Sequence, residues 1–223
     1  MRWFGGVASF ALALTLASSA AGQLTFQHHY IDRDLPIYKG WIGDYGQTAL
    51  ADFDRDGKLD FALGRQGQPA TLFWFQYREP GQWTKHVLGQ ESMATVGAVA
   101  LDVDRDGWPD LVSSGVWYRN PQNPREREFS RFLYDKDGGG AHDVIVADLD
   151  GDGRQDVVTL GEGKNGLCWY TIPQDPTQPW GKHRVGPGIH GGIAPNGAGD
   201  LDGDGDLDLV CANTWYENAD GKG

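Results

Sequence analysis

The chain has 223 residues, of which 31 are acidic and 19 basic, and its formal net charge at pH 7 is −12. It carries no basic stripe of the kind that binds nucleic acid, which excludes that class of partner. Thirty-three glycines and 12% aromatic residues, without a long amphipathic helical stretch, are typical of short strands joined by tight turns.

The N-terminal residues have the features of a signal peptide. Arg2 supplies a short positive start, residues 3–17 are apolar and uncharged, and small residues follow at 18–22. The apolar run is shorter than the roughly 20 residues that span a membrane, which argues against an anchor. We therefore expect residues 1–22 to be removed. The chain from residue 23, which has no later segment of spanning length, should be secreted, periplasmic or at the cell surface.

An acidic loop begins at Asp52 and recurs three times at intervals of about 50 residues. Each copy reads Asp-x-Asp-x-Asp-Gly-x-x-Asp, with strand-like residues on both sides. A repeat of this length, with strands in each unit, is typical of propellers and other arrays. The loop aspartates are Asp52, Asp54, Asp56 and Asp60; Asp102, Asp104, Asp106 and Asp110; Asp148, Asp150, Asp152 and Asp156; and Asp200, Asp202, Asp204 and Asp208.

These residue types at this spacing favour calcium. Calcium takes six to eight oxygen ligands at roughly 2.3–2.6 Å, and alternating aspartates in a tight turn direct their carboxylates to one centre. The glycine at position six permits a positive φ. The residue at position seven offers its carbonyl oxygen, and the aspartate at position nine closes the loop. We expect about four Ca²⁺ ions, one in each loop, which would stabilise the folded loops.

Two other interpretations of the loop are weaker. An EF-hand needs a glutamate at position 12 between two helices, whereas position 12 here is Leu63, Ser113, Thr159 and Cys211, and the flanks are strand-like. A plain Asp/Gly-rich turn that binds no ion would not be expected to keep every aspartate in four copies.

The acidic loops and their flanking strands resemble FG-GAP or VCBS-type repeats, the calcium-loop repeats of integrin α-chain propellers and of many secreted bacterial proteins. The resemblance covers about residues 24–223. It implies an all-β fold, a β-propeller of four-stranded antiparallel blades, with each acidic loop between the first two strands of a blade. It implies structural calcium. It does not imply one activity, because these repeats serve adhesion, sugar binding and some catalysis.

An aromatic pair follows each acidic loop, on the expected third strand of each repeat. The pairs are Trp74-Phe75, Trp117-Tyr118, Trp169-Tyr170 and Trp215-Tyr216. They could stack on a sugar, but recurrence at one architectural position favours packing between neighbouring sheets.

A third pattern predicts the fourth, outer strand of the first three repeats: Trp83-x-x-His86, Phe129-x-x-Phe132 and Trp180-x-x-His183. Phe26-x-x-His29 matches it before the first acidic loop, so we expect an N-terminal strand that completes the last sheet if the ring is closed, and that is left unpaired if the chain is a fragment. The strand count then fits a closed four-blade ring. The alternative, which the turn-like ending at 218–223 favours, is a fragment of a larger propeller of about seven blades.

The histidines differ in their expected roles. His29, His86 and His183 occupy matched outer-strand positions and are expected to be architectural. His142 and His190 instead lie in connections that lead into inner strands, near glycine runs. Such connections gather around the channel of a propeller, on the face opposite the calcium loops. His142 and His190 are therefore ligand-binding candidates and weak catalytic candidates, although a surface or capping role stays open.

The connection before the first acidic loop is longer than its later equivalents. It carries Trp41 and Asp44, which could stack on and hydrogen-bond a sugar. The alternative, which is favoured, is a cover over the channel entrance. The cysteines, Cys168 and Cys211, could form a disulfide in an exported protein or remain two small buried thiols.

The sequence favours an exported calcium-binding propeller that acts as a binding or scaffolding module. A glycan or another extracellular protein is the expected partner, with Trp41, Asp44, His142 and His190 as ligand-binding residues. The alternative is a carbohydrate-active enzyme, a polysaccharide lyase or sugar dehydratase, that uses His142 or His190. Convergent polar residues around these two histidines would favour the enzyme.

Overall fold

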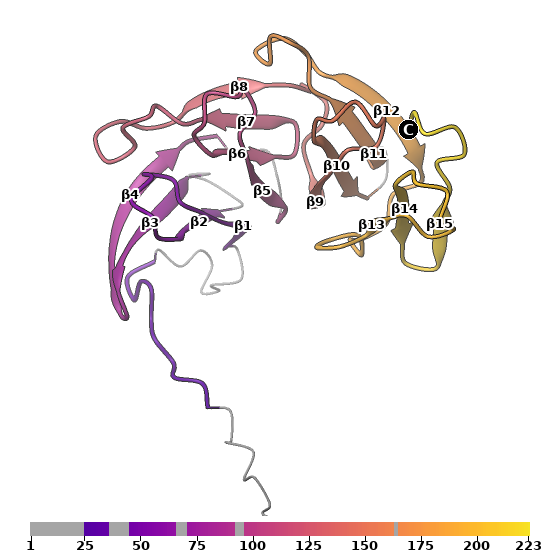
Figure 1. The fold of residues 1–223 in the computed structure, drawn as a ribbon. Coiled ribbons are helices and arrows are strands. Elements are labelled where there is room, and N and C mark those ends of the chain that lie inside the picture. The colour runs from indigo at the N-terminus through magenta and orange to yellow at the C-terminus, as the bar shows by residue number, and fades with distance from the viewer. Residues whose placement is uncertain (1–24, 36–44, 66–70, 92–95, 163–164) are drawn as a thin grey trace, which may run out of the picture.

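A computed structural model describes residues 25–35, 45–65, 71–91, 96–162 and 165–223. This part of the chain contains strands and turns and no helix, so the all-β prediction is confirmed for it. The strands form four separate antiparallel sheets, which follow one another in chain order around an arc (Figure 1).

The first three sheets have four strands each, and the fourth has three among the described residues. The first contains β1 (Tyr45–Ala51), β2 (Asp60–Arg65), β3 (Leu72–Glu79) and β4 (Gln82–Gly89). The second contains β5 (Ala98–Leu101), β6 (Asp110–Ser113), β7 (Val116–Arg119) and β8 (Ser130–Leu133). The third contains β9 (Ala141–Ala147), β10 (Asp156–Gly161), β11 (Gly166–Thr171) and β12 (Gly181–Gly186). The fourth contains β13 (Ala198–Gly199), β14 (Asp208–Cys211) and β15 (Thr214–Tyr216).

All four sheets share one plan. Within each, consecutive strands are neighbours, and the acidic loop joins the first strand to the second. The aromatic pair lies on the third strand in every case, as predicted. The first strands β1, β5 and β9 contact one another in succession. They therefore line the inside of the arc, and β4, β8 and β12 lie on the outside (Figure 1).

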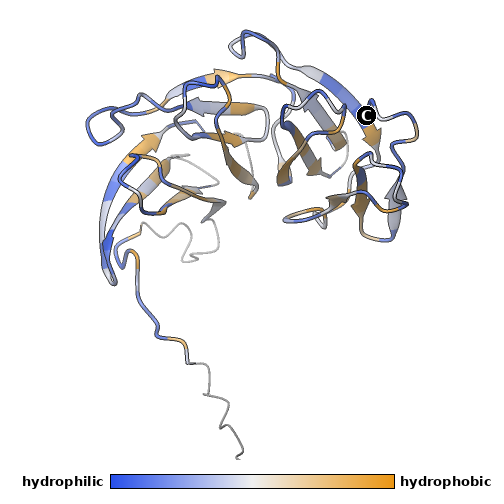
Figure 2. Cartoon of the chain, in the orientation of Figure 1, coloured by the Kyte–Doolittle hydropathy of each residue, from blue (hydrophilic) through white to orange (hydrophobic). Residues whose placement is uncertain are grey.

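Apolar side chains hold adjacent sheets together. In the first three sheets the second and third strands are the most buried, and every residue of β10 is buried. Three buried clusters lie between the first and second, second and third, and third and fourth sheets. Figure 2 shows the hydrophobic residues in the inner and middle strands and hydrophilic residues along the loops and β12. Each contact between two neighbouring sheets, here called a joint, thus has its own buried core, as in other stacked repeats.

The aromatic and outer-strand patterns meet inside each complete sheet. The tryptophan of the third strand stacks on the outer-strand residue, with ring centroids 4.4 Å apart for Trp74 and His86, 5.0 Å for Trp117 and Phe132, and 4.1 Å for Trp169 and His183. His86 and His183 are therefore architectural, as predicted. In the fourth sheet Trp215 remains 46% exposed.

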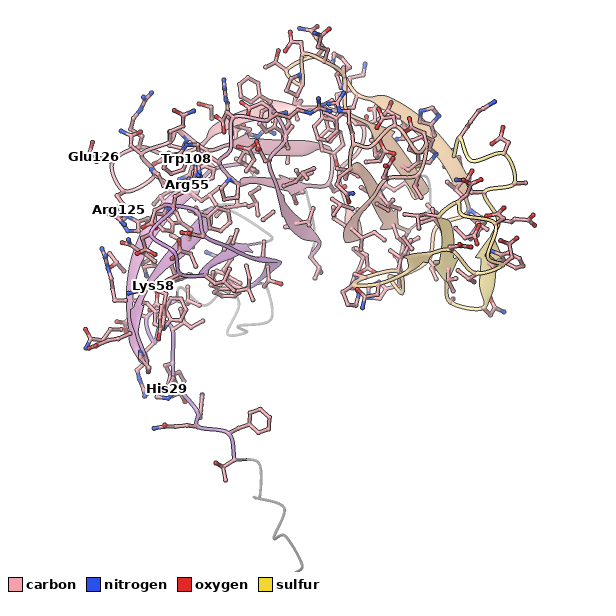
Figure 3. The ribbon with its side chains drawn as sticks, viewed as in Figure 1. His29, Arg55, Lys58, Trp108, Arg125 and Glu126 are labelled. Atoms are coloured by element: carbon pink, nitrogen blue, oxygen red, sulfur yellow. The ribbon has the colours of Figure 1, made fainter. Side chains whose placement is uncertain are left out.

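The predicted N-terminal outer strand does not form. Residues 25–30 have no strand structure, and Phe26 is 98% exposed. This segment lies beside the first sheet, where Asp32 forms an ion pair with Lys85 of β4 at 2.6 Å (His29 is labelled in Figure 3). It is therefore held at the far end of the arc from β15 and does not pair with it.

The closed four-blade ring is likewise not the arrangement seen. The first and fourth sheets lie at opposite ends of an open arc (Figure 1). The ring does not close because the rotation from each sheet to the next is too small for four sheets to complete a circle. Both cysteines, Cys168 and Cys211, are buried free thiols. Among the described residues no helix is long and apolar enough to cross a membrane.

Candidate metal loops and channel-face histidines

Each acidic loop is closed by the same hydrogen bonds. The backbone N–H of the glycine at position six donates to the first aspartate, at 2.8 Å from Gly57 to Asp52 and 2.9 Å from Gly153 to Asp148. These glycines have φ values of +88° and +84°, which L side chains rarely adopt. The predicted requirement for glycine at this position is confirmed by the geometry.

The loops bring carboxylates together. In each, oxygens of three aspartates lie within 4.8 Å of one another: Asp52, Asp54 and Asp60; Asp102, Asp104 and Asp110; Asp148, Asp150 and Asp156; Asp200, Asp202 and Asp204. The remaining predicted ligands, Asp56, Asp106, Asp152 and Asp208, lie in the same loops but outside these groups of three.

The ninth aspartate is the buried member of each loop. One oxygen of Asp110 accepts the N–H of Val103 at 3.0 Å, and Asp60 and Asp156 are held in the same way. Burial, reinforced by the neighbouring loop carboxylates, raises the pKa of Asp60 to about 7, of Asp110 to about 8 and of Asp156 to about 7. The first three loops therefore hold more negative charge than their surroundings stabilise, whereas in the fourth the backbone hydrogen bond from Asn218 holds the pKa of Asp208 below its ordinary value.

The donor set fits a hard cation. All side-chain donors are carboxylate oxygens, which calcium prefers. Asp148 Oδ1 is a buried oxygen without a hydrogen-bond partner among the described residues, and a bound cation would satisfy it. Where arginines are near, they act as partial substitutes: Arg125 Nη2 lies 2.8 Å from Asp54 Oδ2. Figure 3 shows Arg125 on the same side of the first joint as Arg55 and Trp108. The Arg55 guanidinium carbon lies 5.4 Å from the centroid of the Trp108 ring.

His142 and His190 come together although 48 residues separate them in the sequence. Their ring centroids are 4.4 Å apart at an angle of 52°. His142 lies on β9, and His190 in the connection from β12 to β13. Each Nδ1 faces a carboxylate: His142 lies 2.8 Å from Asp143 Oδ1, and His190 lies 3.1 Å from Glu162 Oε1.

Asp143 anchors this arrangement. Its second oxygen, Oδ2, accepts the backbone N–H groups of Gly192, Ile193 and Ala194 at 2.7, 2.9 and 3.1 Å. Burial opposes ionisation, but the hydrogen bonds from His142 and from these three N–H groups outweigh it and hold the pKa of Asp143 below its ordinary value. An ionised Asp143 thus fixes both the His142 ring and the connection that carries His190.

A cavity of about 370 Å³ adjoins His142. Its lining includes Thr48 of β1, Val99 of β5, His142 and Asp143 of β9, and Pro195. It is therefore bordered by the inner strands of three sheets. A second cavity, of about 520 Å³, lies between the acidic loops of the second and third sheets and is lined in part by Arg105 and Arg154.

Two predicted ligand-binding residues, Trp41 and Asp44, lie outside the described residues. The sequence analysis did not identify Asp143 and Glu162, the carboxylates that contact His142 and His190. The adjacency of Asp143 to His142 was the available signal for the first. Nothing local marks Glu162, which reaches His190 only because the connection between β12 and β13 passes over the end of β10.

The repeated sheets with their acidic loops define an all-β repeat protein. Comparison with protein families agrees: the model of the FG-GAP-like repeat matches residues 52–113 and 148–211, over half of the chain. The chain belongs to the FG-GAP-like repeat family. It is similar to cartilage acidic protein 1 of Xenopus tropicalis, with 27% identity over 135 residues, which cover 53% of this chain and 21% of that protein. The chain thus spans about a fifth of the length of this relative.

Proposed function

We propose that the chain is an exported, calcium-stabilised binding module in which residues 23–223 form β-propeller repeats after removal of residues 1–22. The inner strands that follow one another along the arc support the propeller assignment. The family, and the likeness to an animal protein named for cartilage, support a place outside the cell.

Calcium is proposed for all four acidic loops, with the sixteen aspartates as ligands. The groups of carboxylates within 4.8 Å support this, as does the unpartnered Asp148 Oδ1. When bound, the ions would balance the carboxylate charge and lock the turn between the first two strands of each sheet. These residues then present little free chemistry to a ligand.

The proposed ligand is a glycan or an extracellular protein held at the channel face. The observation that carries this proposal is the meeting of His142 and His190, each oriented by a carboxylate, beside the 370 Å³ cavity. Such a site combines apolar walls with a few placed polar groups, as ligand sites commonly do. Trp41 and Asp44 are proposed as further contacts.

A glycan-array screen of the whole chain, with and without calcium, tests this function. Bound glycans should be lost on His142→Ala and His190→Ala, while calcium-dependent stability stays nearly unchanged. His183→Ala is the matched control, because His183 stacks within its own sheet. Full binding in the double variant, with loss only when an acidic loop is removed, would place the site on the opposite face.

One observation favours a second candidate, a polysaccharide lyase or sugar dehydratase. Two carboxylate-oriented imidazoles 4.4 Å apart could serve as a general base and a general acid at one substrate. His142, which borders the cavity, would be the base. Turnover of an acidic polysaccharide, followed by the absorbance of an unsaturated product and abolished by His142→Ala, would establish this candidate over simple binding.

A further inference from the structure

The imidazole pair has the features of a transition-metal site. A histidine that binds a metal through one ring nitrogen usually donates its other N–H to a carboxylate or carbonyl, which fixes the ring and its tautomer. Both His142 and His190 have this arrangement, with Nδ1 directed at Asp143 and Glu162 respectively. The Nε2 atoms are then the acceptors that face away from the carboxylates.

The backbone is shaped to bring the two rings together. Gly191 has φ of +85°, and a Cβ at this position would lie 2.6 Å from His142 Nδ1. Only glycine therefore lets the connection approach His142 closely enough to carry His190 beside it. The three N–H groups that bind Asp143 Oδ2 hold the same connection in place.

Solvent can reach the pair. The side chain of His142 is 30% exposed and that of His190 is 76% exposed. An ion could therefore enter without unfolding the joint, and water could complete its coordination. Imidazole ligands suit zinc, copper and nickel, whereas calcium prefers oxygen. The donor atoms of the acidic loops and of the histidine pair thus suit different classes of ion.

We propose that His142 and His190 bind one divalent transition-metal ion, such as Zn²⁺, through their Nε2 atoms, with Asp143 and Glu162 as the outer carboxylates that orient them. The ion would occupy the channel face beside the 370 Å³ cavity, and a sugar hydroxyl or carboxylate could displace one of its waters. This inference extends the proposed ligand site, but metal binding is measured without any glycan, so the two can fail separately.

Calorimetric titration of Zn²⁺ into the calcium-saturated chain tests the proposal. We expect one equivalent of zinc that excess calcium does not displace. His142→Gln combined with His190→Gln should abolish it, and Asp143→Asn should weaken it by about 10–100-fold while both ligands remain. His183→Gln, a control in another exposed histidine, should leave the equivalent unchanged.

A spectroscopic arm identifies the ligands. The electron paramagnetic resonance spectrum of one bound Cu²⁺ should show nitrogen hyperfine splitting from two imidazoles, reduced to one in either single variant. Circular dichroism confirms that each variant is folded. The proposal is overturned if the calcium-saturated chain takes up no zinc, or if the zinc equivalent persists in the folded double histidine variant.

Discussion

The side-chain amide of Asn120 donates a hydrogen bond to the backbone carbonyl of Phe53, at 2.9 Å, across the joint between the first two sheets. Asn218 makes the matching bond to the carbonyl of Leu149, at 2.7 Å, across the joint between the last two. Both asparagines lie two residues after the aromatic pair of the third strand. Ile172 holds this position in the third sheet and packs in the apolar cluster with Val103. The cavity of about 520 Å³ lies at that middle joint.

The sheets are thus joined in pairs. The two segments that match the family model, residues 52–113 and 148–211, each begin in the acidic loop of one sheet and end in the second strand of the next. The asparagine bonds tie the same pairs. The second and third sheets are linked by a different hydrogen bond, in which the hydroxyl of Tyr170 donates to Asp135 Oδ2 at 2.9 Å.

Replacing Asn120 by Ala tests how much its hydrogen bond to Phe53 stabilises the contact between the first two sheets. Its side chain is 1% exposed and also donates to Pro109, so the variant leaves buried carbonyls without a donor. We expect a loss of about 1–3 kcal/mol in the free energy of unfolding, measured by urea denaturation. Asn123→Ala, at an exposed position, should change little. Equal effects of the two substitutions would show that the bond to Phe53 contributes nothing specific.

Calcium removal should destabilise the chain. Extracellular calcium sites have dissociation constants on the order of 10⁻⁴–10⁻³ M, and one site adds about 2.7 kcal/mol when free calcium exceeds that constant 100-fold. Melting in calcium and in a chelator measures the effect, and calorimetry counts the ions. Asp150→Ala should remove one of about four equivalents, whereas Asp175→Ala, outside the loops, should remove none. A melt that chelation leaves unchanged would contradict the calcium assignment.

The repeated parts of the fold could be predicted because they repeat. The acidic loop, the aromatic pair and the outer-strand pattern recur at matched positions, so their strands could be assigned from the sequence. The meeting of His142 with His190 could not be predicted, because it depends on how the connection after β12 returns over β9 and β10. The N-terminal segment was expected to pair with the last sheet only in a closed ring, and in the open arc it is unpaired although Phe26 and His29 match the outer-strand pattern. A pattern specifies which residues could pair, and the curvature of the arc decides whether the partner is within reach.

Asp135 should make stability depend on acid pH. Burial opposes its ionisation, but hydrogen bonds from Lys182, the backbone of Asp137 and Tyr170 hold its pKa below the ordinary value. A carboxyl whose pKa is lowered by folding contributes stability above its unfolded pKa near 4 and loses it as pH falls through the folded pKa. Asp135→Asn should therefore lower the melting temperature at pH 7 by an amount that shrinks towards pH 3. A difference that stays constant over this range would assign the effect to packing.

Replacing Gly57 by Ala measures the cost of the left-handed backbone conformation in the acidic loop separately from any steric clash. It has φ of +88°, and a Cβ added there would meet nothing within 4 Å. Any cost of Gly57→Ala must therefore come from the left-handed backbone and not from a clash. We expect a loss of about 1–2 kcal/mol in unfolding free energy, measured in a chelator so that ion binding does not contribute.

Gly199 provides the matched control for this substitution. A Cβ there would also meet nothing within 4 Å, but its φ is not in the positive range. Gly199→Ala should be neutral or slightly stabilising, because alanine restricts the unfolded chain at a compatible site. If both alanine variants melt alike, the positive φ costs nothing, and the glycine at position six is needed for some other reason. If only Gly57→Ala is destabilised, the sixth position requires glycine before any ion binds.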